Sequence, residues 1–226
     1  MSRSTAPRVV CFDLGGVLVR ICRSWDEACV QAQLPFRDAR AFASEAMRSR
    51  RKDVVDRYQR GELDSDAYYV ELSLAVDGLY SITEVEQIHA AWTLKEYPGA
   101  LELIQELNRL PEVATACLSN TNSVHWHRLA GEDGRAEYPA VLALRHRLAS
   151  HLLRCAKPDA IIYERARAAF FEPLAGRPED IIFFDDLPEN VASARAAGWT
   201  AFEVDPHADT ASQMRRALVS VGVLAR

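Results

Sequence analysis

The sequence predicts an α/β fold, in which helices cover both faces of a parallel β-sheet. Two observations support this prediction. Short apolar runs typical of buried strands occur at residues 8–12, 113–118 and 180–184, and stretches with helical periodicity separate them. Each of these strands also ends in polar side chains, at the edge of the sheet where ligands bind in folds of this class.

The length and composition fit a core domain with a smaller insert. The chain has 226 residues, of which 49% are hydrophobic, so it can bury a substantial core. Its net charge of −5 provides no basic surface, and we therefore expect no nucleic acid as the main partner. The N-terminus lacks the apolar stretch of a signal peptide, and no apolar run reaches membrane-spanning length. We therefore expect no membrane partner.

The cysteines indicate a reducing compartment. There are five of them, an odd number, and they are scattered without a CxxC pair. We therefore predict reduced thiols and a cytoplasmic location. The sequence leaves the oligomeric state open.

The first strand, residues 8–12, runs directly into Asp13, and the pair Gly15 and Gly16 follows. A carboxylate at this position, beside backbone that can approach a ligand closely, can serve as a nucleophile or as a metal ligand. The same pattern is also typical of an ordinary strand-to-turn ending, so this motif alone leaves the function open.

Residues 20–95 are predicted to form a helical insert. Between about residues 24 and 92 the apolar positions follow helical spacing, and no strand signal interrupts them. Asp64 or Ser65 can cap one helix, and Ser81 with Glu84 fits a capping box for another. The strongly charged stretch at residues 47–61 is interpreted as a solvated helix face.

From Pro98 onward the chain alternates between helices and strands. Pro98 lies near a helix start, and Gly198 ends a later helix. A polar loop is predicted at residues 131–139, and a turn of undetermined type at 141–144. The remaining predicted elements are strands at 113–118, 180–184 and 200–204, and helices at 123–129, 159–171, 189–197 and 209–219.

Polar side chains that could bind a ligand or take part in a reaction follow the later strands. Ser119 and Asn120 precede a helix, where hydroxyl, amide and free backbone N–H groups can bind an anion, although they can also be a plain helix cap. Lys157 opens another helix and can neutralise negative charge. Asp13, the Gly15 carbonyl and one acid of the pair Asp185–Asp186 can form an oxygen site that suits Mg²⁺.

The stretches FDLGGVLV, RGELDSDAY, LSNTN, KPDAIIYERA and FFDDLPENVASARAAG together resemble the haloacid dehalogenase-like (HAD) hydrolase superfamily. Within it they resemble subfamily IA variant 3, which includes α-D-glucose-1-phosphate phosphatases and the phosphatase domain of soluble epoxide hydrolases. The resemblance covers about residues 8–205. It implies a Rossmann-like α/β core at residues 1–19 and 96–226, with residues 20–95 as a helical cap over the substrate.

The resemblance also implies the function, which is Mg²⁺-dependent hydrolysis of a small phosphomonoester through an aspartyl-phosphate. Asp13 would be the nucleophile, and Asp186 would bind the metal with Asp13 and the Gly15 carbonyl. The resemblance also implies roles for residues that support the site or bind the substrate. Ser119, Asn120 and Lys157 would hold the phosphoryl oxygens, Asp185 would support the site and pair with Lys157, and Asn190 would orient Asp186 or simply sit on its helix.

The sequence departs from the common HAD pattern at Gly15, where many of these phosphatases carry a second Asp as general acid. An acidic leaving group, such as the anomeric hydroxyl of an aldose-1-phosphate, would need less protonation. His125 is a candidate for the missing proton donor, or it simply packs. Candidates for the underside of the cap, or alternatively for its core, are Arg23, Trp25, Tyr58 and Trp92.

Alternatives to a sugar phosphatase remain. Another small phosphorylated metabolite can be the substrate, and the missing acid at Gly15 also fits a degenerate HAD protein that only binds a ligand or partner. The third alternative is a 2-haloacid dehalogenase. True haloacid dehalogenases lack the paired acids, so Asp185 and Asp186 argue against it.

Overall fold

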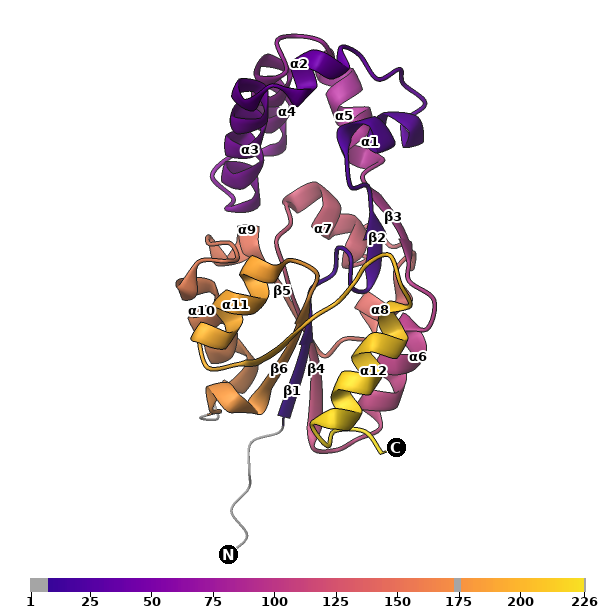
Figure 1. Cartoon of the computed structure of the whole chain (residues 1–226), viewed down its shortest axis with the longest axis vertical. Coiled ribbons are helices and arrows are strands. Elements are labelled where there is room, and N and C mark those ends of the chain that lie inside the picture. Colours follow the sequence, from indigo (N-terminus) through magenta and orange to yellow (C-terminus); the bar gives the residue numbers. More distant parts are fainter. Residues whose placement is uncertain (1–7, 173–175, 226) are drawn as a thin grey trace, which may run out of the picture.

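The computed structural model describes residues 8–172 and 176–225. The N-terminal stretch without signal-peptide character, residues 1–7, lies outside these ranges. Five parallel strands form the central sheet, and most of residues 20–95 forms a helical layer above its carboxyl edge (Figure 1). The predicted α/β class is confirmed.

The sheet has the strand order β5-β4-β1-β6-β7. Its members are β1 (Arg8–Phe12), β4 (Val113–Ser119), β5 (His146–Ala149), β6 (Ile181–Asp185) and β7 (Thr200–Glu203). The central strand β1 is flanked by β4 and β6, with Phe12 in register with Cys117 and Phe184. The residues that follow these three strands therefore meet at one edge.

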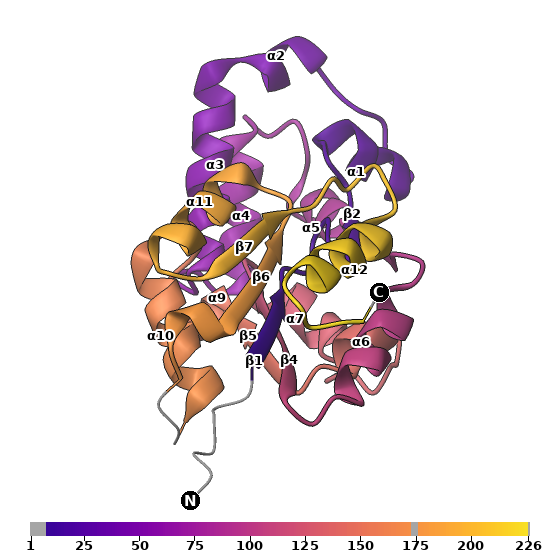
Figure 2. The same ribbon diagram turned by 60° about the horizontal axis from the view of Figure 1, so that its bottom comes forward.

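Alternate residues of the strands pack under different helices. Val10 and Phe12 of β1 face α6 (Ala100–Asn108), α7 (Ser123–Leu129), α8 (Pro139–Leu142) and α12 (Thr210–Ser220). Val9 and Cys11 face α10 (Ala160–Phe171) and α11 (Pro188–Ala196). Figure 2 shows α10 and α11 on one side of the sheet and α6 and α12 on the other. The short elements α9 (Ser150–Leu153) and the 3₁₀ turn η1 (Pro178–Asp180) complete this part of the chain.

The insert contains five helices with an apolar cluster of their own. They are α1 (Trp25–Gln31), α2 (Ala39–Ala43), α3 (Glu45–Gln59), α4 (Ser65–Ala75) and α5 (Ile82–Ala90). Asp64 caps α4, and the capping box of Ser81 and Glu84 opens α5, as predicted. The separate apolar cluster supports the division into a core and a cap, which stays a prediction.

Three short strands were missed by the sequence analysis. The antiparallel pair β2 (Val19–Ile21) and β3 (Thr93–Glu96) joins the insert to the core. Helix α8 overlaps the stretch 141–144 where a turn was predicted, and strand β5 lies just after it, where no element was predicted. Elements of three or four residues are too short for periodicity to identify them. The bounds predicted for the other strands and helices differ from those of the structure by at most one residue at either end. The five cysteines are buried and form no disulfide, which agrees with the predicted reduced thiols.

None of the helices within the described residues is both long and apolar enough to cross a lipid bilayer.

Candidate active site

Three strand ends bring the predicted acidic and hydroxyl side chains together. Asp13 follows β1, Ser119 ends β4, and Asp185 ends β6 with Asp186 directly after it. The backbone N–H of Asp13 donates to the carbonyl of Phe184 at 2.8 Å, which extends the pairing of β1 and β6 to the level of the acids. The geometry therefore follows from the parallel register of these neighbouring strands.

Lys157 is the central cation of the site. Its Nζ lies 3.0 Å from Asp13 Oδ1 and 2.6 Å from Asp185 Oδ2, and its side chain is fully buried. Burial alone would lower the pKa of Lys157, but the charges of Asp13 and Asp185 raise it above its usual value. The lysine is therefore held as a cation beside Asp13.

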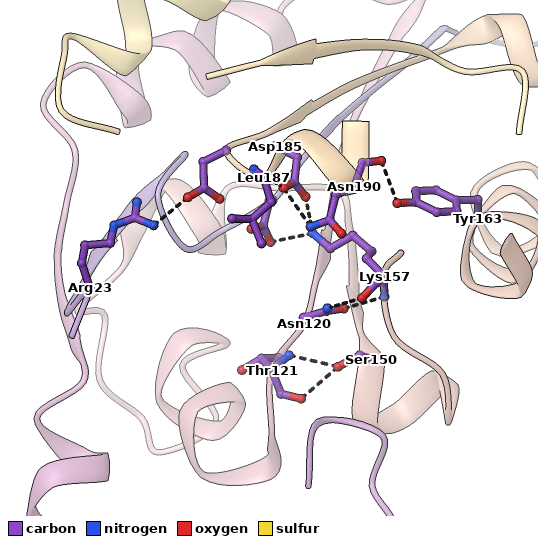
Figure 3. A network of polar contacts seen from close by, with 11 residues as sticks. Arg23, Asn120, Thr121, Ser150, Lys157, Tyr163, Asp185, Leu187 and Asn190 are labelled. Atoms are coloured by element: carbon purple, nitrogen blue, oxygen red, sulfur yellow. Dashed lines mark hydrogen bonds and ion pairs between the residues drawn. The ribbon is translucent and has the colours of Figure 1, made fainter. Parts of the chain in front are cut away.

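Both oxygens of Asp185 are occupied by donors from the protein. Oδ1 accepts hydrogen bonds from the Leu187 backbone N–H and from Asn190 Nδ2, both at 2.9 Å, while Oδ2 pairs with Lys157 (Figure 3). Asp185 thus positions Lys157, as the resemblance implied. The expectation that Asn190 orients Asp186 is wrong, because its side-chain amide bonds to Asp185.

Asp13, Asp185 and Asp186 each place one carboxylate oxygen within 4.8 Å of the others, which is a geometry that can hold a metal ion. Because Asp185 is occupied by its donors, Asp13 and Asp186 are the acids left to act as ligands. Burial raises the pKa of Asp13 to about 7, with Lys157 opposing and the two other acids reinforcing the rise. Burial also raises the pKa of Asp186. The three acids outnumber the two cations that pair with them, Lys157 and Arg23, and the hard oxygen donors fit Mg²⁺.

Arg23, which was one candidate for the underside of the cap, supplies a second cation to the acidic cluster. Its guanidinium forms a 2.6 Å ion pair with Asp186 Oδ2 (Figure 3). Gly16, with a φ of +84°, passes between them, and a Cβ at this position would lie 2.6 Å from Asp186 Oδ2. Gly16 therefore allows the insert to approach the acid closely.

Gly15 adopts no left-handed conformation, so its backbone admits other residues. A Cβ built there would lie 3.0 Å from Cδ1 of Ile21 on β2. The space into which a side chain at position 15 would extend is therefore bounded by the aliphatic side chain of Ile21.

Asn120 acts through Lys157 rather than through a free side chain. Its Nδ2 donates to the Lys157 carbonyl at 2.8 Å, and its Oδ1 accepts from the Lys157 N–H at 2.9 Å. The expectation that the Asn120 amide itself holds phosphoryl oxygens therefore does not fit its hydrogen bonds. Within the described ranges the backbone N–H groups of Gly15 and Asn120 have no acceptor, and the Ser119 hydroxyl has no hydrogen-bond partner. These donors can bind an anion.

His125 is locked by its neighbours. Its ring stacks on His89 of α5, with centroids 3.9 Å apart, and its Nε2 lies 2.8 Å from the His89 carbonyl. The Asn122 Nδ2 lies 3.2 Å from both His125 Nδ1 and His89 Nε2. Burial lowers the pKa of His125 to about 4 and also lowers that of His89. Both nitrogens of a neutral His125 are thus occupied, which argues against the predicted role as proton donor.

A cavity of about 560 Å³ lies between the strand ends and the insert. Gly15, Ser119 and Asn120 line it from the core side, and Trp25 and Trp92 line it from the insert, as was considered for these two aromatics. The hydroxyl of Tyr58 instead lies 2.9 Å from Ser65 Oγ, with the ring buried in the insert. The predicted solvated face of residues 47–61 is only partly solvated, because one side of α3 faces this cavity.

Comparison with known proteins identifies a family. The model of the haloacid dehalogenase-like hydrolases matches residues 7–198. A HAD family enzyme from Bacteroides thetaiotaomicron superposes with a TM-score of 0.72 at 16% identity, covering 93% of this chain and 100% of that one. The same enzyme solved with magnesium and inorganic phosphate gives a TM-score of 0.68 at 17% identity, with 92% and 100% covered.

Dehalogenases are also among the structural neighbours. The L-2-haloacid dehalogenase from Xanthobacter autotrophicus, solved with chloropropionic acid covalently bound, superposes with a TM-score of 0.60 at 17% identity. The match covers 96% of this chain and 84% of the dehalogenase. At these identities the structural likeness establishes the fold and leaves the choice between the two chemistries to the site.

Proposed function

Because the chain belongs to the haloacid dehalogenase-like hydrolase family, we propose that it is a Mg²⁺-dependent phosphatase of small phosphomonoesters. The single observation that supports this most is the arrangement of Lys157 between Asp13 and Asp185, with Asp186 beside them. It supplies a nucleophile, a fixed cation and, in Asp186, an acid with one oxygen that Arg23 does not occupy.

Asp13 acts as the nucleophile. One of its carboxylate oxygens forms a bond to phosphorus while the bond from phosphorus to the leaving oxygen breaks, which gives an aspartyl-phosphate. Water then attacks phosphorus, releases inorganic phosphate and regenerates the Asp13 carboxylate. Lys157, 3.0 Å from Asp13, balances the negative charge that gathers in both steps.

The metal would be held by Asp13, the Gly15 carbonyl and Asp186. Bound Mg²⁺ offsets the repulsion between the Asp13 carboxylate and the anionic phosphoryl group. The Ser119 hydroxyl, the backbone N–H groups of Gly15 and Asn120, and Lys157 bind the phosphoryl oxygens. Asn120 and Asp185 are positioning residues, because their side chains fix the backbone and the ammonium group of Lys157.

The leaving group must depart with little proton donation. Gly15 has no side chain, Ile21 fills the adjacent space, and both nitrogens of His125 are occupied. We therefore expect substrates whose leaving oxygen is stable as an anion. Anomeric sugar hydroxyls, which the sequence analysis favoured, and phenols both meet this requirement.

The dehalogenase alternative is weakened by the paired acids, since Asp186 has no evident use in a reaction without a metal.

The test is phosphate release from a panel of phosphomonoesters, in chelated protein and after adding Mg²⁺. We expect activity only with Mg²⁺. Release of halide from 2-haloacids in chelated protein would contradict the proposal, and release of neither product would favour a non-catalytic protein.

A further inference from the structure

One face of α3 points into the cavity. Arg48, Arg51, Lys52, Val55 and Gln59 follow the spacing of a single helix face, and all five line the cavity. The two neutral residues lie at the end of the helix toward the core. The three cations lie further out, with Lys52 about 10 Å along the axis from Gln59.

These cations lack counter-charges, unlike their neighbours on the same helix. In the part of the chain that the structure describes, Arg51 and Lys52 form no ion pair, and Arg48 reaches only Glu45, at 3.8 Å. By contrast, Arg50 pairs with Asp77 at 2.8 Å on the outside of the helix. Among the described residues, the cavity lining contains no acidic side chain.

Arg51 has an unused donor beside the cavity. Its guanidinium lies 4.7 Å from the ring centroid of Phe42 and donates to the Phe42 carbonyl at 3.0 Å. Its Nε is buried without a partner among the described residues. A positive wall that is not neutralised by the protein favours an anionic ligand.

The rest of the chamber is mainly apolar. Its walls include Trp25, Tyr68, Leu72, Val85, Ile88 and Trp92. The polar groups His89, His125 and Asn122 that also line it are hydrogen-bonded to one another. The apolar side chains of this wall offer no partner to the hydroxyls of a sugar, whereas an aromatic ring needs none.

The acidity of the leaving group also favours an aromatic substrate. A phenol ionises near pH 10, as tyrosine does, whereas an ordinary alcohol ionises near about 16, as water does. An aryl phosphate therefore releases its leaving group without the acid that is absent at Gly15.

We propose that the substrate is an aryl phosphate with a second anionic group, and that Arg48, Arg51 and Lys52 bind this group at the outer end of the chamber. The identity of the substrate class rests on the proposed phosphatase function, but the anion site does not.

The test compares 4-carboxyphenyl phosphate with the neutral analogue 4-carbamoylphenyl phosphate. In the unmodified protein we expect the carboxylate to raise kcat/KM about tenfold or more, mainly through KM, as charge-assisted hydrogen bonds allow. The double variant Arg48→Gln/Lys52→Gln changes two exposed side chains, so it should fold and lose this preference. The variant Arg50→Gln removes a cation from the same helix outside the cavity and should keep the preference.

Any of three results would overturn the inference. They are equal kcat/KM for the two esters, an equal loss of the preference in Arg50→Gln, and faster turnover of α-glucose 1-phosphate than of the carboxylated ester. Binding of 4-carboxybenzylphosphonate and 4-carbamoylbenzylphosphonate, measured by calorimetry, tests the anion site separately from the proposed phosphatase function. In one outcome the carboxylated compound binds more tightly, the double variant loses this difference, and the protein shows no phosphatase activity. This outcome would refute the proposed phosphatase function alone. Phosphatase activity with equal binding of both compounds would refute the anion site alone.

Discussion

At the residue scale, the site is a cluster of three acids held by two cations. Lys157 bridges Asp13 and Asp185, and Arg23 holds Asp186. Both oxygens of Asp185 are occupied by donors of the protein, while Asp13 is buried and is paired with Lys157. Asp185 therefore positions Lys157, and Asp13 is the acid to which the proposed function gives the reacting role.

Replacing Asp13 should abolish activity and keep the fold. We expect Asp13→Asn to lower kcat at least about 1,000-fold, because the amide cannot form the covalent intermediate. The substitution is nearly isosteric and removes one negative charge from a crowded cluster, so thermal unfolding should show an unchanged or higher Tm. Asp26→Asn, on the exposed side of α1, is the matched control. Near-normal turnover by Asp13→Asn would show that another group attacks phosphorus.

Restoring an acid at Gly15 requires space. A Cβ there lies 3.0 Å from Ile21 Cδ1, and Ile21→Val removes that atom. We expect Gly15→Asp/Ile21→Val to flatten the dependence of kcat/KM on leaving-group acidity, measured across aryl and alkyl phosphates. Ile21→Val alone is the control and should retain the steep dependence. An unchanged slope in the double variant would mean that residue 15 does not face the leaving oxygen.

At this scale the sequence predicted which polar side chains would meet, because Asp13, Ser119 and the pair Asp185–Asp186 lie at strand ends; their catalytic roles stay predictions. It did not identify their partners. Asn120 bonds to Lys157, which is 37 positions away in the chain, and Asn190 bonds to Asp185 instead of Asp186. Such pairings depend on how loops fold back over the sheet edge, which residue type and spacing do not determine.

At the element scale, α5 of the insert meets α7 of the core through two stacked imidazoles. Asn122 links His89 and His125, and the burial of both rings lowers their pKa values. We expect protonation of either ring to weaken this contact, because burial disfavours the charged form. It therefore makes the junction between insert and core sensitive to acid.

The histidine pair should give a stability loss between pH 6.5 and about 4. In this range the unfolded state binds protons that folded His125, with a pKa of about 4, does not bind. Its contribution is thus complete above pH 6.5 and falls with pH by about 1.4 kcal/mol per unit. Urea unfolding of the unmodified protein and of His125→Gln measures the difference. His127→Gln, on the exposed side of α7, is the control, and identical pH slopes in the unmodified protein and in both variants would refute the account.

The helices were predicted better than the short strands. Long amphipathic segments and caps such as Ser81 with Glu84 carry local signals, and these elements lie where they were predicted. Strands β2, β3 and β5 have three or four residues each and depend on pairing with distant segments. Likewise, the charge of α3 is visible in the sequence, but which of its faces meets the cavity depends on tertiary packing.

At the scale of the whole molecule, the acids lie at the strand ends of the core, and the cations of α3 line a cavity on the insert side of those strand ends. Family and fold were predictable because several motifs occur in order along the chain. The cavity was not predictable from the sequence, because its lining comes from segments between Leu14 and Leu129 that only the fold brings together. The assignment to subfamily IA variant 3 and the sugar-phosphate substrate stay predictions.

Metal binding should stabilise the molecule in a pH-dependent way. Protons compete with Mg²⁺ for Asp13, whose pKa is raised to about 7 before the metal binds, and for Asp186. We therefore expect the rise in Tm caused by Mg²⁺ to grow as the pH increases from 5.5 to 8. Asp186→Asn should remove most of this rise. A pH-independent shift, or the same shift in Asp186→Asn, would place the metal elsewhere.

The central claim is that Asp13 carries the phosphoryl group during turnover. The most direct measurement is an acid quench of the protein during steady turnover of an aryl phosphate with Mg²⁺, followed by mass spectrometry of its peptides. The account predicts a phosphoryl group on the peptide that contains Asp13 and none in Asp13→Asn. Turnover without this adduct under conditions that preserve acyl-phosphates, or an adduct that persists in Asp13→Asn, would contradict it.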